Sequence, residues 1–184
     1  MFKRACAPMT IEHFVRQTWV LAVLLVLGQT LASAATDIYI ETVIDPSGQL
    51  RISTKRRREI VPKKEPDQTG FRDVQISPDG HAVGWLALFQ KSSTSDPEAT
   101  QLVIQMGDSQ HILAGNGLPI LGWCFWGGAK QVAFKQETVH GGMAVHYELR
   151  DIETGQVTDK YDPDANPDST TKPPKWVVVL DSRL

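Results

Sequence analysis

The chain after residue 34 consists mainly of short runs of β-branched and aromatic residues. Clusters of Gly, Pro, Asp and Asn separate these runs at intervals of roughly 8 to 12 residues, which is typical of antiparallel all-β domains. Apolar residues with convincing helical spacing are absent from this part of the chain. The sequence therefore predicts an all-β domain of antiparallel sheets with little helix.

The first predicted element is a hairpin of strands 38–43 and 50–54, joined by the turn 45–48 (Asp-Pro-Ser-Gly). Proline at the second turn position fixes φ, and the glycine tolerates a positive φ. Segment 55–70 follows, and we expect a loop there because it is dense in basic residues and contains two prolines.

Two similar series of short strands are predicted next. Val83 and Trp85 align with Val132 and Phe134 at an offset of 49 residues, and the later strands of the two series align at an offset of 45. Two copies of a four-stranded unit are therefore predicted. The strands of the first copy are 74–76, 82–89, 102–106 and 111–113, and those of the second are 120–125, 131–134, 145–149 and 156–157.

A repeat of about 45 to 50 residues with four short strands is a signature of propeller blades. Residues 76–80 (Ile-Ser-Pro-Asp-Gly) precede an apolar strand, and residues 147–155 end in an Asp-x-x-Thr-Gly turn. In these features, segment 71–161 resembles Tol-type and WD-type β-propeller repeats. The resemblance implies blade-like sheets that provide binding surfaces.

A closed propeller needs roughly four or more blades, whereas this chain offers two units, the first hairpin and a late strand predicted at 176–180. The ring therefore cannot close within one chain. Two arrangements stay open: a self-capped stack of sheets, or a homodimer in which two chains combine.

The N-terminus is typical of a signal peptide. Basic residues precede the apolar run 19–27, and the small residues Ala32 and Ala34 fit a cleavage site. The run is shorter than the roughly 20 apolar residues that span a bilayer. We therefore expect a cleaved signal at 1–34, a single domain at 35–184 without a membrane span, and a secreted or periplasmic location, with an uncleaved anchor as the alternative.

Removal of residues 1–34 takes away three of the 19 basic and one of the 21 acidic residues, which leaves a net charge of −4. A protein with this charge is not expected to bind nucleic acid. Of the two cysteines, only Cys124 remains after cleavage, so an intramolecular disulfide is excluded for the cleaved chain.

Segment 162–174 is rich in Pro and Asp, and it is either a solvated linker or a calcium loop. Its oxygen-bearing side chains at alternate positions are of the type that Ca²⁺ prefers. Pro167, however, stands where a calcium loop of the EF type has its turn glycine. The candidate ligands are Asp162, Asp164, Asn166 and Asp168.

Two further sites are candidates for chemistry. Cys124 would act as a nucleophile with His111, His140 or His146 as its base, although its aromatic neighbours favour a buried role. His140 and His146, with Met143 between them, have donors that suit copper or zinc, although the paired glycines between them equally favour a hairpin tip.

Segment 51–64 contains seven basic residues and one acidic residue. It is either a plain solvated loop or a contact for anionic lipid, cell-wall polymer or an acidic protein. Arg56, Arg57 and Arg58 are the candidate binding residues.

The aromatic side chains have two interpretations, a ligand-binding face or core packing between repeats. The set comprises Trp85, Trp123, Phe125, Trp126 and Phe134.

Taken together, these patterns predict an exported binding module without catalytic chemistry or a bound cofactor. A small hydrolase or metal-dependent enzyme and an assembly partner of the cell envelope are the alternatives.

Overall fold

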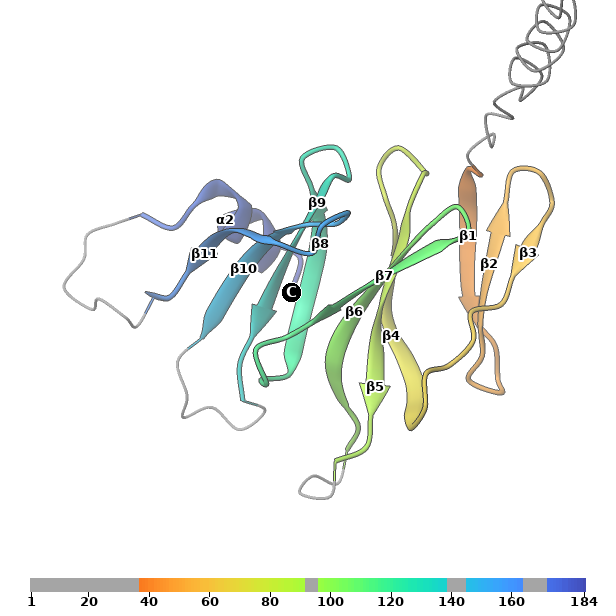
Figure 1. Cartoon of the computed structure of the whole chain (residues 1–184), viewed down its shortest axis with the longest axis horizontal. Coiled ribbons are helices and arrows are strands. Elements are labelled where there is room, and N and C mark those ends of the chain that lie inside the picture. Colours follow the sequence, from red (N-terminus) through yellow and green to blue (C-terminus); the bar gives the residue numbers. More distant parts are fainter. Residues whose placement is uncertain (1–36, 92–95, 139–144, 164–171) are drawn as a thin grey trace, which may run out of the picture. The chain divides into compact units, whose positions relative to one another are not determined.

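In the part of the chain that the structure describes, three antiparallel sheets follow one another (Figure 1). The structure is a computed structural model, and it describes residues 37–91, 96–138, 145–163 and 172–184. All of these residues belong to one compact unit, Thr36–Leu184. The predicted all-β fold with incomplete blade-like units is confirmed.

The N-terminal sheet contains strands β1 (Tyr39–Ile44), β2 (Leu50–Thr54) and β3 (Glu59–Ile60), in that spatial order. The hairpin predicted from the sequence forms its first two strands. In its turn, the carboxylate of Asp45 accepts hydrogen bonds from the backbone N–H groups of Ser47 and Gln49. The expected loop over 55–70 is wrong at two places. Residues 68–70 belong to the strand that follows it, and β3 interrupts it. Strand β3 forms because Ile60 pairs with Ile52 on the side of β2 away from β1.

The central sheet contains the next four strands, each paired with the one before it. Strand β5 is buried along most of its length, as its apolar sequence predicts for a covered central strand. The strands are β4 (Gln68–Ile76), β5 (Val83–Phe89), β6 (Glu98–Met106) and β7 (Ser109–Ala114).

The C-terminal sheet has the same topology as the central sheet, because each of its four strands is paired with the strand before it in the chain. Val83 and Trp85 lie in the second strand of the central sheet, and their aligned residues Val132 and Phe134 lie in the second strand of this one. The strands are β8 (Ile120–Trp126), β9 (Gln131–Gln136), β10 (His146–Asp151) and β11 (Val157–Tyr161).

The predicted strand at 176–180 is wrong, because this segment lies in helix α2 (Lys175–Asp181). Trp176, Val177 and Leu180 are buried while Val178 is 53% exposed, which is the spacing of one helical face rather than of a strand. Pro174 occupies the N-cap position. Within the described residues, no helix is both long enough and apolar enough to cross a membrane.

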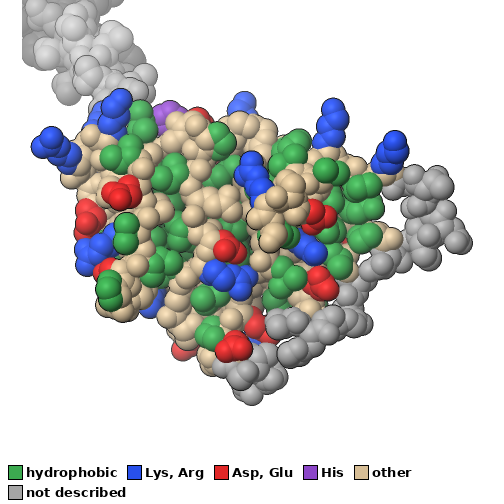
Figure 2. Space-filling model, turned by 180° about the vertical axis from the view of Figure 1, so that it is seen from behind, with side chains coloured by type: hydrophobic (Ala, Val, Ile, Leu, Met, Phe, Trp, Pro, Cys, Tyr) green, Lys and Arg blue, Asp and Glu red, His purple; other side chains and the backbone are tan. Residues whose placement is uncertain are grey.

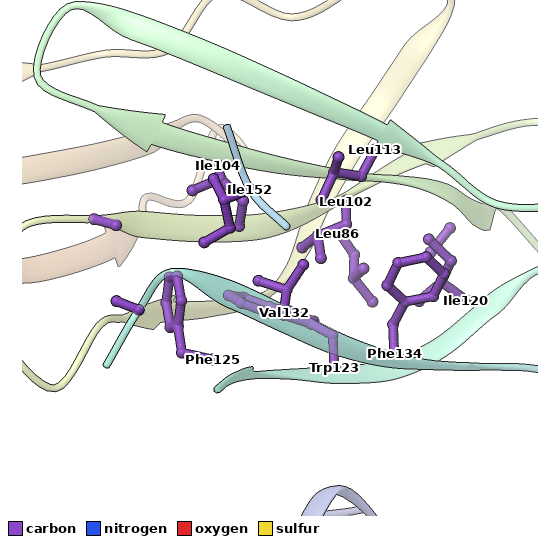
Figure 3. Packing of buried hydrophobic residues seen from close by; sticks show 13 residues of the cluster. Leu86, Leu102, Ile104, Leu113, Ile120, Trp123, Phe125, Val132, Phe134 and Ile152 are labelled. Atoms are coloured by element: carbon purple, nitrogen blue, oxygen red, sulfur yellow. The ribbon is translucent and has the colours of Figure 1, made fainter. Parts of the chain in front are cut away.

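The described sheets and helix pack as successive layers, and their described residues form three apolar clusters. One cluster joins the N-terminal and central sheets and includes Tyr39, Ile52 and Trp85. The largest joins the central and C-terminal sheets, where Leu86 and Leu102 face Trp123 and Phe134 (Figure 3). A third lies between the C-terminal sheet and α2. Each layer is therefore held by apolar contacts to its neighbours.

Hydrogen bonds also join the central and C-terminal sheets, along their first strands. The amide of Gln75 on β4 donates to the carbonyl of Trp123 on β8 at 2.9 Å. In return, the Trp123 indole donates to the carbonyl of Asp73 at 2.9 Å. These bonds fix the two sheets against each other beside their shared apolar cluster.

Five of the turns gather on one edge of the described domain, at the top of Figure 1. We call this the turn edge. Hydrogen bonds connect its parts, because the carbonyl of Gly80 accepts from the backbone N–H of Tyr39, and the carbonyl of Gly107 accepts from the Tyr39 hydroxyl. The turn edge comprises the segments 55–58, 77–82, 107–108, 127–130 and 152–156.

Candidate binding surface

The turn between β2 and β3 carries four consecutive basic residues, and we call it the basic turn (Lys55, Arg56, Arg57 and Arg58). The carbonyl of Thr54 accepts a hydrogen bond from the backbone N–H of Arg57 at 2.9 Å. Arg57 has a φ of 62°, in the left-handed region that glycine favours. A larger residue in this conformation is uncommon, which makes this turn unusual as well as strongly charged.

Arg58 anchors the basic turn to the rest of the domain. Its guanidinium donates to Asp37 at 3.0 Å and to Asp108 in the turn between β6 and β7 at 2.8 Å. The hydrogen bond and charge of Asp108 contribute most to raising the pKa of Arg58 above its usual value. The Asp37 side chain is only 10% exposed, so one of these bonds reaches into the domain.

The other three side chains of the basic turn are exposed. In contrast to Arg58, Lys55, Arg56 and Arg57 make no side-chain ion pair or hydrogen bond with any described residue. In the rear view of Figure 2, Lys and Arg side chains project from the upper edge of the domain, where the turns lie. The predicted binding residues therefore separate into an anchor, Arg58, and free cations that include Arg56 and Arg57.

A pocket of about 600 Å³ opens farther along the turn edge, between the central and C-terminal sheets. Ser109 and His111 line it from β7, and Lys130 and Glu153 line it from turns of the C-terminal sheet. Ala129, which also lines it, has a φ of 63° and is mostly buried. The pocket thus combines an apolar interior with side chains of both charges, a mixture that does not favour one class of ligand.

His146 lies between two carboxylates near the start of β10. Its Nε2 atom is 2.9 Å from Glu148, and its Nδ1 atom contacts Asp162, which follows β11. Glu148 is also paired with Arg150 at 2.6 Å. Burial by itself lowers the pKa of His146, but the two carboxylates outweigh this effect and the pKa is raised. The His146 side chain therefore connects β10 to the segment after β11, and its contacts favour the protonated form.

The calcium site predicted at the end of the chain falls mostly outside the described residues. Asp164, Asn166 and Asp168 lie there, while Asp162 is described and is engaged with His146. His140 and Met143, from the predicted copper or zinc site, also lie outside. Among the described residues, no group of three or more His, Cys, Asp or Glu side chains is placed to hold a metal.

Cys124 is fully buried in the cluster between the C-terminal sheet and α2. Burial raises the pKa of its thiol and so disfavours the thiolate. His111 faces the pocket on the opposite side of this sheet. His146 also points away from Cys124. It shares a face of β10 with Glu148, which pairs with Phe134. Phe134 faces the central sheet, whereas Cys124 faces α2. The structure therefore brings neither His111 nor His146 to the thiol, and the third candidate base, His140, lies outside the described residues.

The aromatic side chains pack in the interior rather than forming a binding face. Trp85, Trp123 and Phe134 are at most 2% exposed. Phe125 is also buried and contacts Trp123 edge to face, with ring centres 5.0 Å apart. Trp126 is partly buried and packs against the α2 cluster. Core packing was one of the two interpretations, and the burial favours it.

The sequence alone did not reveal the ionic contacts of Arg58, the pocket or the pairing of His146. Alternation along β10 places His146, Glu148 and Arg150 on one face, so this part of the cluster was detectable. The partners Asp37, Asp108 and Asp162 come from separate segments and had no local signal.

No family model matches the chain, and no curated protein matches it significantly. Function is therefore inferred from the geometry of the surface.

Proposed function

We propose that this protein is an exported, non-catalytic binding module that holds an acidic protein partner of the cell envelope against its basic turn. Export is proposed from the signal-like sequence at 1–34. The observation that carries the binding proposal is that the four residues of the basic turn have two different roles. Arg58 is fixed by two carboxylates, and three neighbouring cations face solvent.

A turn that is already held in place favours binding, because the partner does not have to supply the free energy needed to order its backbone. The exposed cations attract an acidic surface over about 8 Å at physiological ionic strength. An exposed apolar side chain lies nearby, since Ile38 is 36% exposed and its carbonyl accepts a hydrogen bond from the Lys55 N–H. Mixed basic and apolar surfaces of this kind suit a protein partner better than a purely charged polymer.

The test compares capture from an envelope extract by the wild-type protein and by a variant with Arg56→Gln and Arg57→Gly. Gly relieves the left-handed conformation at residue 57, so the fold should be retained or stabilised. We expect one partner to be captured by the wild type, in a manner weakened by salt, and lost from the variant. A matched control, Lys63→Gln with Lys160→Gln, removes the same charge from other exposed positions and should capture normally.

Equal capture by the wild type and the basic-turn variant, or no capture by the wild type, would contradict the proposal. Sedimentation with vesicles of phosphatidylglycerol and phosphatidylcholine tests anionic lipid as the ligand. Vesicle binding that depends on Arg56 and Arg57, without a captured protein, would overturn the choice of a protein partner.

A further inference from the structure

The N-terminal sheet lacks a strand that the other two sheets possess. In those sheets the first strand leads into a turn on the turn edge, and the second strand begins there. Strand β1 instead begins at the turn edge, beside Gly80, and leads into the turn 45–48 at the other end. By direction, β1, β2 and β3 thus correspond to the second, third and fourth strands of each four-stranded sheet. Among the described residues, the position of a first strand beside β1 is unoccupied.

The edge of β1 is suited to accept another strand. Ile40, Val43 and Ile44 are 58%, 48% and 44% exposed, and Glu41 is the single charged residue of the strand. Edge strands are usually protected by lysine, proline or cover from another element, and β1 contains neither residue. The N–H of Tyr39 is already bonded to Gly80, so the open part of the edge is residues 40–44.

We propose that the occupant is β1 of a second copy of this chain, paired antiparallel about a two-fold axis. The strand is complementary to itself in the register that places Thr42 opposite Thr42. Glu41 then lies opposite Val43 of the second copy, so like charges do not face each other. The pairing joins two three-stranded sheets into one and removes exposed apolar side chains from water.

The charges at the two ends of β1 favour the same orientation. Asp45 follows the strand, and its pKa is lowered to about 2 by hydrogen bonds from Ser47, from the Gln49 N–H and from Arg51, so it is charged. The basic turn lies at the other end, because Lys55 bonds to Ile38. Antiparallel pairing brings Asp45 of one copy toward the end where the other copy carries its basic turn. The opposite charges therefore meet at each end of the joined sheet.

The test is the mass of the wild-type protein by light scattering and sedimentation equilibrium over a range of concentrations. We expect twice the mass of one chain, and at least a tenfold increase in the dimer dissociation constant for Val43→Lys. Val157→Lys is the matched control, because Val157 is 47% exposed on the edge strand β11, and it should leave the dimer intact. Circular dichroism establishes that both variants fold.

Cross-linking tests the register. In a Cys6→Ser background, Thr42→Cys should form a covalent dimer under mild oxidation, since opposed residues of antiparallel strands have Cα atoms about 4.5–5.5 Å apart. Thr158→Cys should not. A monomer at every concentration, equal effects of the two lysine variants, or no selective cross-link would overturn the proposal. The dimer is tested at residues 42 and 43, whereas capture of an acidic partner is tested at Arg56 and Arg57. A failure of capture with the dimer mass retained is therefore distinguishable from a failure of the dimer.

Discussion

Gly84 lies in β5 where the central and C-terminal sheets approach closely. A Cβ atom at this position would overlap the ring of Trp123 and the side chain of Ile104. Trp123 cannot move aside easily, because its indole is hydrogen-bonded to the carbonyl of Asp73. Replacing Gly84 therefore overpacks a rigid part of the core.

We expect Gly84→Ala to lower the free energy of unfolding by about 1–3 kcal/mol, the usual cost of overpacking, as measured by urea denaturation. Gly122→Ala is the control. A Cβ at Gly122 would overlap only the side chain of Leu184, which is 60% exposed and can move into solvent. Its effect should stay below about 0.5 kcal/mol. Equal destabilisation by the two variants would contradict this account.

The His146 cluster predicts a dependence of stability on pH. The pKa of His146 is raised above 6.5 in the folded protein. Its contribution to stability is therefore complete below the unfolded value and is lost as the pH rises through the higher folded pKa. Urea denaturation of the wild type should show this loss above about pH 6.5, and His146→Gln should reduce it. If the difference in unfolding free energy between the wild type and the variant does not change with pH across this range, the carboxylates do not stabilise the protonated form of His146.

At the scale of elements, the strands of the sheets were largely predictable because their period of two and their turn residues are local signals. Segment 176–180 was not. Its three consecutive valines favour a strand, yet Trp176, Val177 and Leu180 cover the outer face of the C-terminal sheet as a helix. The site was less predictable than the fold, since Arg58 is held by residues 21 and 50 positions away.

The cover provided by α2 is testable through Cys124. Leu180 is fully buried in the same cluster as the thiol. We expect Leu180→Ala to lower the unfolding free energy by about 2–5 kcal/mol and to speed the reaction of Cys124 with a thiol reagent. Val178→Ala changes a side chain that is 53% exposed and should alter neither property. Similar reaction rates in all three proteins would mean that α2 does not shield the thiol.

At the scale of the whole molecule, the described layers should unfold together. The largest apolar cluster draws residues from both four-stranded sheets, so neither sheet keeps its buried face when the other unfolds. We expect one transition in urea, with tryptophan fluorescence and far-ultraviolet circular dichroism giving the same midpoint. Separate midpoints would indicate that the sheets are independent folding units.

The layered packing has a consequence for how such a chain can change in length during evolution. Because each apolar cluster joins adjacent layers, a duplicated four-stranded sheet can be inserted between two existing ones without remodelling distant parts, as in solenoid proteins. The inserted sheet needs only two apolar faces and a compatible first strand. The fold thus permits growth by whole sheets, whereas loss of a single strand from within a sheet would expose two new edges.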